Sequence, residues 1–205
     1  MHNKAVMFVL SLFLFGAGAA NAQVGDQTSI GPRVGVNFSN VSNVEGSKSL
    51  TGLVLGLTST YSISEETGLT VDLLYSQEGY SLNEDDIALN YLQLPIYFDL
   101  FFGNLGDKFR PKVYAGIVPG FFLGGNLNGN TFSSEEKDFY NSINFAVSGG
   151  LGFNLRVASR VWLNTDLRAY LGLNDFRDES FQNGDKNANN TIQLSLGLAY
   201  GLSKI

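Results

Sequence analysis

The sequence contains no cysteine, and its only histidine is His2. The absence of cysteine excludes disulfides, thiolate metal sites, cysteine nucleophiles and a cysteine-linked lipid anchor. A chain that loses His2 also loses Ser-His-Asp triads and histidine metal sites, so enzymes of the outer membrane that use a Ser-His pair are excluded. Acid–base chemistry by carboxylates, lysine or tyrosine is the class that remains, and the sequence has no distinctive motif for it. We therefore predict a protein that is not an enzyme and has no cofactor or metal site. Calcium binding by the acidic loop at 174–190 stays open, although its carboxylates, Asp175, Asp178, Glu179 and Asp185, lack EF-hand spacing.

Charged residues are also scarce, at 16% of the 205 residues, whereas soluble domains usually have about 25%. The 13 Lys and Arg residues are outnumbered by 19 Asp and Glu residues, which gives a net charge of −6. Nucleic-acid binding requires clustered positive charge, so this balance argues against a nucleic-acid partner.

The first 22 residues have the pattern of a secretory signal peptide. Lys4 precedes an apolar stretch over 5–15, and Ala20, Asn21 and Ala22 form an A-x-A cleavage site. A membrane-spanning helix needs about 20 apolar residues, which this stretch does not reach. We expect cleavage after Ala22, which leaves residues 23–205 as one mature domain.

Apolar and polar residues alternate along most of the mature chain. Near its end, Ile192, Leu194 and Leu196 alternate with Gln193 and Ser195. A period of two is typical of a β-strand with one apolar and one polar face. Eight segments share the pattern: 33–39, 52–63, 69–78, 91–100, 112–121, 143–157, 161–173 and 191–202.

The length and composition of these segments favour a membrane barrel. Several exceed ten residues, whereas strands of soluble proteins average about five to six and a bilayer-spanning strand needs about 9–11. Their apolar faces carry no Lys, Arg, Asp or Glu, as contact with lipid requires. The connections at 40–50, 80–88, 124–142 and 174–190 are long or medium, and those at 64–66, 103–109 and 158–159 are shorter. We predict an all-β, eight-stranded antiparallel up-and-down transmembrane β-barrel with short periplasmic turns and longer outer loops, surrounded by outer-membrane lipids.

Pro95 and Pro119 interrupt two of the predicted strands. Proline cannot donate a hydrogen bond to a neighbouring strand, and a closed barrel has no edge strand to accommodate it. We expect each proline to mark a bulge or a local bend, and the strand register beyond each of them stays open.

The interior of an eight-stranded barrel is just wide enough to be filled by side chains. The polar faces place four cations and four carboxylates inside: Arg33, Lys112, Arg156 and Arg168 against Asp72, Glu78, Asp99 and Asp166. Because unpaired buried charges are costly, we predict that these groups form a hydrogen-bonded network and close the lumen to solutes. The alternatives are a path for protons, ions or small solutes, and a carboxylate pair that acts as acid and base.

Four short motifs extend over the mature chain: GPRVGVNFS at 31–39, YLQLP at 91–95, YAGIVPG at 114–120 and GGLGF at 149–153. They resemble those of the PorT-like outer membrane protein β-barrel family of Bacteroidetes and, more loosely, the OmpA and OmpX barrels. This resemblance implies a location in the outer membrane of a Gram-negative cell. The last strand is also similar to the signal read by the barrel-assembly machinery, a further expected partner. The matching positions are Ser195, Gly197, Tyr200 and Leu202, although Ser203-Lys204-Ile205 replaces the terminal aromatic residue.

These observations leave several candidate functions. We expect a structural or interaction barrel whose outer loops meet an unknown partner. The family resemblance also implies a second candidate, an accessory barrel for secretion of the type IX kind. A third candidate is a soluble secreted barrel of the lipocalin type, which would need apolar residues inside; the expected interior is polar and charged instead.

Overall fold

A computed structural model describes residues 28–104, 106–177 and 187–202 of the chain. The predicted signal peptide lies outside these ranges. The described residues form ten strands and one short helix, α2 (Ser134–Lys137). The strands are β1 (Thr28–Val41), β2 (Lys48–Ser62), β3 (Thr67–Leu82), β4 (Asp85–Gln93), β5 (Ile96–Phe101), β6 (Phe109–Leu127), β7 (Asn130–Thr131), β8 (Ile143–Ala158), β9 (Val161–Gly172) and β10 (Asn189–Gly201). No helix in these ranges is long and apolar enough to cross a membrane.

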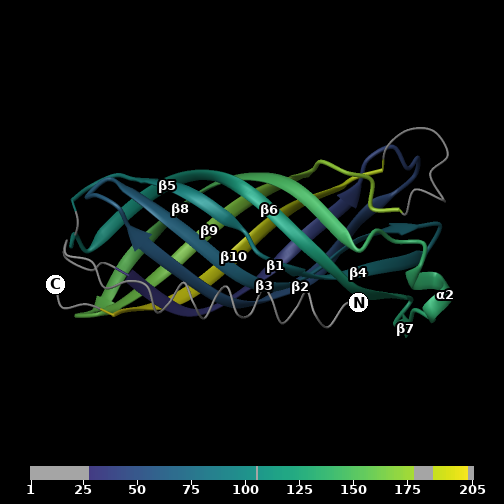
Figure 1. The fold of residues 1–205 in the computed structure, drawn as a ribbon, viewed down its shortest axis with the longest axis horizontal. Coiled ribbons are helices and arrows are strands. Elements are labelled where there is room, and N and C mark those ends of the chain that lie inside the picture. The colour runs from purple at the N-terminus through teal and green to yellow at the C-terminus, as the bar shows by residue number, and fades with distance from the viewer. Residues whose placement is uncertain (1–27, 105, 178–186, 203–205) are drawn as a thin grey trace.

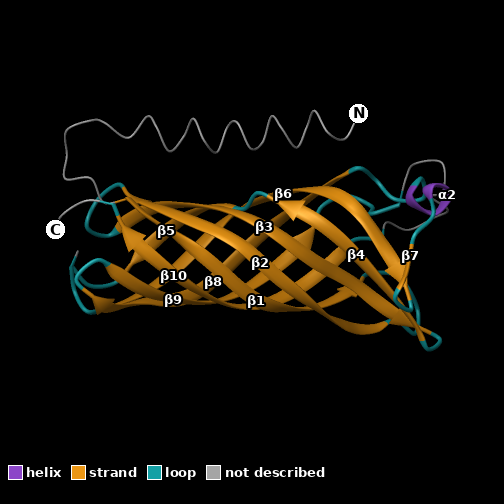
Figure 2. Cartoon of the chain, turned by 90° about the horizontal axis from the view of Figure 1, so that it is seen from below, coloured by secondary structure: helices purple, strands orange, loops and turns teal. Residues whose placement is uncertain are grey.

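The strands form one closed antiparallel sheet (Figures 1 and 2). Neighbours follow the order β2-β1-β10-β9-β8-β6-β4-β3, and pairing between β2 and β3 closes the ring. β4 and β5 share one position, because both pair with β3 on one side and with β6 on the other. β7 pairs only with the end of β6. The ring therefore has eight positions, and the predicted eight-stranded up-and-down barrel is confirmed.

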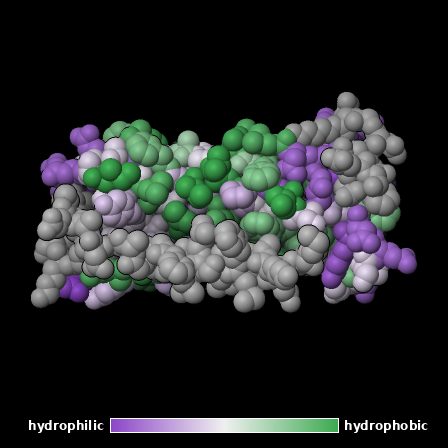
Figure 3. Space-filling view, in the orientation of Figure 1, coloured by the Kyte–Doolittle hydropathy of each residue, from purple (hydrophilic) through white to green (hydrophobic). Residues whose placement is uncertain are grey.

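Side chains alternate between the inside and the outside of this ring. On β10, Gln193 and Ser195 are buried inside, whereas Leu194, Leu196 and Leu198 are 47–50% exposed outside. Figure 3 shows apolar side chains over the middle of the barrel and hydrophilic ones toward both ends. An apolar outer band around a polar interior is the arrangement that a lipid bilayer requires. It is the inverse of a soluble barrel that holds an apolar ligand, so the lipocalin-like alternative is wrong.

The connections differ at the two ends of the barrel. The end where β1 starts and β10 finishes carries the connections at 63–66, 102–108 and 159–160. The opposite end carries the connection at 42–47, the described residues 173–177 and 187–188 between β9 and β10, and the segment with β7 and α2. We call it the outer end (Figure 1). One outer connection is shorter than predicted: the medium gap at 80–88 is a two-residue turn at Asn83 and Glu84, both with positive φ. This conformation matches the twist of a hairpin and lets β3 and β4 pair to their tips.

The two prolines lie beside the same break in the barrel wall. β4 ends at Gln93 and β5 begins at Ile96, so Pro95 interrupts the strand as predicted. Pro119 stays inside the continuous β6, and its carbonyl oxygen accepts a hydrogen bond from Leu94 N at 2.9 Å. The N–H that Pro119 lacks would point to the same side, where β4 and β5 are interrupted. The in–out alternation continues past Pro95, where Tyr97 and Asp99 are buried and Phe98 is exposed. It continues past Pro119 to the buried Phe122 and the exposed Leu123, where the pairing of β6 with β4 shifts register.

Candidate functional site

Charged side chains meet in the middle of the barrel interior. We call this group the central ion cluster: Arg33, Lys112, Arg168, Asp72, Asp99 and Asp166. Each member is at most 3% exposed. Three cations and three carboxylates give the cluster a formal net charge of zero. The alternation of β1, β3, β5, β6 and β9 turns all six side chains inward, although they are far apart in the sequence.

The shortest ion pairs of the cluster connect strands that are not neighbours in the ring, and the pair of Arg168 on β9 with Asp72 on β3 connects opposite walls. Arg33 Nη1 lies 2.6 Å from Asp166 Oδ2, and Lys112 Nζ lies 3.0 Å from Asp166 Oδ1. Arg168 Nη1 lies 2.7 Å from Asp72 Oδ2, which Arg33 Nε also approaches at 3.6 Å. Charge-assisted hydrogen bonds of this length are the strong ones in proteins. The pairs thus bridge β1, β3, β6 and β9 across the lumen.

Tyrosine rings fill the space around the cluster. The guanidinium carbon of Arg168 lies 4.7 Å from the ring centre of Tyr97 and 5.6 Å from that of Tyr114. Arg168 Nε also donates to Tyr114 Oη at 3.3 Å, and Lys112 Nζ lies 5.0 Å from the Tyr114 ring centre. Such cation–π contacts gain strength when the cation is removed from water.

A chain of polar side chains extends from the cluster toward the outer end. Tyr170 Oη donates to Gln193 Oε1 at 3.1 Å, and Gln193 Nε2 donates to Asn37 Oδ1 at 3.1 Å. Asn37 Nδ2 donates to Ser76 Oγ at 2.8 Å. Glu78 lies next in this chain, where it accepts hydrogen bonds from Gln93 Nε2 at 2.7 Å and from Ser76 Oγ. Its partners are neutral groups, so it lies outside the central ion cluster.

Two arginines differ from the predicted interior. Arg156 is only half-buried and lies over the ring of Trp162 at 5.7 Å, apart from the cluster. Arg110, which the sequence patterns left outside the strand, is 4% exposed. Its side chain donates to the carbonyl oxygen of Glu65 and lies 4.3 Å from the ring centre of Phe101. Arg110 thus stabilises the end of the barrel opposite the outer end.

The four residues at assembly-signal positions lie on or just after β10. Ser195 is buried inside, where it accepts a hydrogen bond from Arg33 Nη1 at 2.9 Å. Gly197 pairs with Arg33 of β1, while Tyr200 and Leu202 are exposed outside the barrel. Because β10 pairs with β1, these residues belong to the strand that closes the ring.

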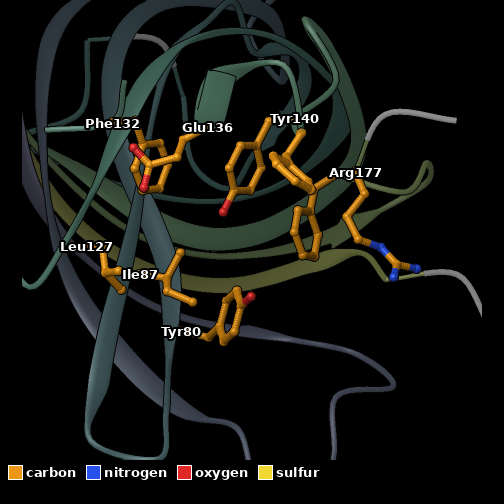
Figure 4. A pocket seen from close by; sticks show the side chains of 9 residues that line it. Tyr80, Ile87, Leu127, Phe132, Glu136, Tyr140 and Arg177 are labelled. Carbon is orange, nitrogen blue, oxygen red and sulfur yellow. The ribbon is translucent and has the colours of Figure 1, made fainter. Parts of the chain in front are cut away.

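A cavity of about 240 Å³ opens at the outer end of the barrel (Figure 4). Most of its wall is apolar, from Ile87, Leu127, Phe132, Tyr140 and Phe176 together with Tyr80. We call it the outer pocket. Tyr140 is central to its ring system: the Phe132 ring lies parallel to it at 5.3 Å, and the Phe176 ring lies at 5.9 Å. Figure 4 shows the Tyr140 hydroxyl pointing into the space above Ile87 and Tyr80.

Contacts between two outer connections hold the pocket together. Asn141 N donates to Phe176 O at 2.8 Å, and the Asn141 amide donates to Asp175 O and Arg177 O. α2 begins with a capping box, in which Ser133 Oγ accepts from Glu136 N and a carboxylate oxygen of Glu136 accepts from Ser133 N. This cap fixes Glu136 beside Phe132 (Figure 4).

Among the described residues, the wall of the outer pocket has two charged side chains, Glu136 and Arg177. The guanidinium of Arg177 pairs with the Asp175 carboxylate at 3.1 Å. Burial opposes ionisation of Asp175, but hydrogen bonds from the Arg177 side chain and from Asn187 N lower its pKa. Burial, followed by the nearby Tyr80 and Glu136, raises the pKa of Tyr140, so this phenol stays protonated at neutral pH. Among the described residues, no cation lies within ion-pair distance of Glu136.

Among the residues that the structure describes, no group of three His, Asp or Glu side chains could hold a metal ion.

The fold is similar to solved outer-membrane barrels. Neisserial surface protein A matches with a TM-score of 0.60 and 13% identity over 87% of this chain and 99% of that chain. OprG of Pseudomonas aeruginosa matches with a TM-score of 0.54 and 16% identity, over 88% and 97% of the two chains. Outer Membrane Protein W of E. coli matches with a TM-score of 0.52 and 16% identity, over 88% and 100%.

No curated protein matches the chain significantly in sequence. The family model described as "Outer membrane protein beta-barrel domain" matches residues 21–178, which is most of the chain. The barrel with its apolar outer band agrees with this match and places the protein in the outer membrane. The chain belongs to the outer membrane protein beta-barrel domain family.

Proposed function

We propose that this protein is a closed, non-conducting barrel that anchors an interaction surface at the outer end. The observation that carries the proposal is the central ion cluster, whose ion pairs cross the lumen from several strands. An open water-filled pore keeps its lining charges solvated and apart, whereas here all six charged groups are buried.

The energetics of buried charge support a permanent closure. Breaking one buried ion pair leaves its partner charge uncompensated at a cost of about 3–5 kcal/mol. A path for ions through the cluster requires several such breaks at once. The Tyr97 and Tyr114 rings pack beside Lys112 and Arg168 and occupy space in the lumen at the level of the cluster.

Electrical recording tests the closed lumen. Purified barrel inserted into a planar lipid bilayer is expected to give no stable single-channel current at neutral pH. A known general porin in the same bilayer serves as the positive control. A large and stable current from the wild-type protein would contradict the proposal.

The outer end carries the features of a binding surface, because it combines the longest connections with an apolar pocket. A non-enzymatic role is supported by the composition of the chain, which has no cysteine and whose single histidine lies in the predicted signal peptide. The carboxylates of the central ion cluster are held by cations instead of being available as acid and base. Recognition of β10 by the barrel-assembly machinery, through Ser195, Gly197, Tyr200 and Leu202, is part of the same proposal.

A secretion accessory of the type IX kind is the second candidate. The motifs at 31–39, 91–95, 114–120 and 149–153, which resemble PorT-like barrels, favour it. Deletion of the gene followed by an assay of secreted cargo separates the two candidates. Loss of cargo secretion from an otherwise intact outer membrane would favour the accessory.

A further inference from the structure

We propose that the outer pocket binds a small organic ammonium, a molecule with an apolar body of about one ring and a single protonated primary amine. The inference deepens the interaction role proposed above by naming a ligand class for the outer end. It does not depend on the closed lumen, since the pocket lies at the outer end, between the strand ends and the outer connections.

The volume of the outer pocket determines the size of the apolar part of the ligand. A dry cavity of about 150 Å³ lined by apolar side chains is large enough to bind benzene. The outer pocket measures about 240 Å³, which leaves room for one ring and a short chain. Ile87, Leu127, Phe132 and Phe176 offer this body an apolar surface, and aromatic pairs gain energy beyond burial alone.

The polar groups of the pocket wall determine which polar group of the ligand they can bind. Neither Tyr80 Oη nor Tyr140 Oη has a hydrogen-bond partner in the described part of the chain. Both tyrosines line the pocket, so their oxygens can hydrogen-bond to a ligand that enters it. A primary ammonium has three donors and no acceptor, and can therefore use two phenol oxygens and one carboxylate together.

The charge of the pocket wall determines the sign of the charge on the polar group of the ligand. Arg177 is neutralised by Asp175 at 3.1 Å. Glu136 accepts from Ser133 N at 2.7 Å, and within the described ranges no cation pairs with it. Among the described charges of the wall, the one without an ion-pair partner is therefore the negative charge of Glu136, which attracts a cation and repels an anion.

Three probes with similar bodies and different heads test this assignment: phenethylamine, 2-phenylethanol and phenylacetate. The barrel is refolded in an uncharged sugar detergent and titrated with each probe by calorimetry at pH 7. We expect phenethylamine to bind about tenfold more tightly than 2-phenylethanol, and phenylacetate to bind most weakly. Ethanolamine, which has the head without the ring, is expected to bind much more weakly than phenethylamine. Tight ethanolamine binding would indicate a site for lipid headgroups and overturn the proposal.

Two matched variants locate the binding site. Glu136→Gln removes the charge but keeps the capping box, because glutamine also accepts from the N-cap N–H. It is expected to weaken phenethylamine binding about five- to tenfold and to leave 2-phenylethanol binding unchanged. Glu135→Gln makes the same change one residue away, outside the pocket wall, and is expected to have no effect.

Several outcomes would overturn the proposal. Equal affinity for all three heads would mean that the pocket is only an apolar surface. Tighter binding of phenylacetate would mean that Arg177 dominates the pocket. A barrel that is folded, as shown by its different migration in SDS gels with and without boiling, but does not bind phenethylamine would also contradict the proposal. So would equal effects of Glu135→Gln and Glu136→Gln. None of these results bears on the conductance test, so the two proposals fail separately.

Discussion

Arg168 makes the densest set of contacts in the central ion cluster. It pairs with Asp72 at 2.7 Å and its guanidinium lies over Tyr97 at 4.7 Å. Arg168→Met keeps the apolar bulk but removes the charge, and we expect it to lower the free energy of unfolding by about 3–5 kcal/mol. Urea unfolding in lipid vesicles measures the loss.

Two further variants make the Arg168 prediction specific to charge. Lys48→Met removes an exposed cation of β2 and is expected to change the free energy of unfolding by less than about 0.5 kcal/mol. Adding Asp72→Asn to Arg168→Met is expected to recover part of the loss, because the uncompensated carboxylate is gone. If Arg168→Met alone lowered the free energy of unfolding as little as Lys48→Met does, the cluster would contribute little to stability.

Asp175 gives the outer connections a dependence on pH. Its pKa is lowered in the folded protein, so its stabilising contribution is fully present above the ordinary value of 3.8 and is lost as the pH falls through the lower folded value. We expect the amide signal of Asn187, which donates to Asp175 Oδ2, to shift in this acidic range. The Asp175→Asn variant should abolish that titration. An unchanged titration in the variant would assign it to another group.

The sequence pattern predicts which residues face the barrel interior, but not how far each one lies from the ends of the barrel. Alternation turns both Arg156 and Arg168 inward, yet Arg156 lies two residues from the end of β8 and reaches the half-exposed rim. Arg110 escaped prediction because it is the second residue of β6, before the alternating segment at 112–121 begins. A periodic pattern states which side a residue faces, whereas its depth depends on where the strand ends.

At the scale of the strands, glycines mark where neighbouring backbones come close. A Cβ atom on Gly116 of β6 would lie 1.9 Å from Ile96 O, whereas a Cβ on Gly149 of β8 would meet its nearest atom, Tyr114 O, at 3.6 Å. Gly116→Ala is therefore expected to destabilise the barrel by more than about 2 kcal/mol. Gly149→Ala should be neutral or stabilise it by about 0.5 kcal/mol, since alanine loses less backbone entropy. Equal effects in urea unfolding would contradict this account of the glycines.

The strands were more predictable than the turns between them. All eight alternating segments appear as strands or strand pairs. The in–out alternation passes Pro95 unchanged, whereas the register of β6 against β4 shifts between Asn90 and Tyr91, shortly after Pro119. The turn at Asn83 and Glu84 was missed because glutamate rarely adopts a positive φ and gives no turn signal. The position of Glu84 in the hairpin turn determines its positive φ, although glutamate prefers a negative φ.

At the scale of the whole molecule, the outer pocket could not be predicted from sequence patterns. Its wall joins Tyr80 of β3, Phe132 and Tyr140 beside α2, and Phe176 after β9. These residues meet only because the connection after α2 docks on the connection after β9 through Asn141. No periodicity runs through such segments, so the contact depends on packing between distant parts of the chain.

The central claim is a barrel with an apolar outside and an interior closed to water-soluble molecules, and the absence of native cysteine allows a direct test. Ser148→Cys places a thiol inside, and the adjacent Val147→Cys places one outside, where the native side chains are 5% and 38% exposed. Each variant is reacted in intact outer-membrane vesicles with a charged maleimide and with a lipid-soluble maleimide, then again after boiling in SDS. We expect the thiol at 147 to react with the lipid-soluble reagent only. The thiol at 148 should react with neither reagent until the barrel is unfolded. Rapid reaction of the folded Ser148→Cys protein with the charged maleimide would contradict the closed interior.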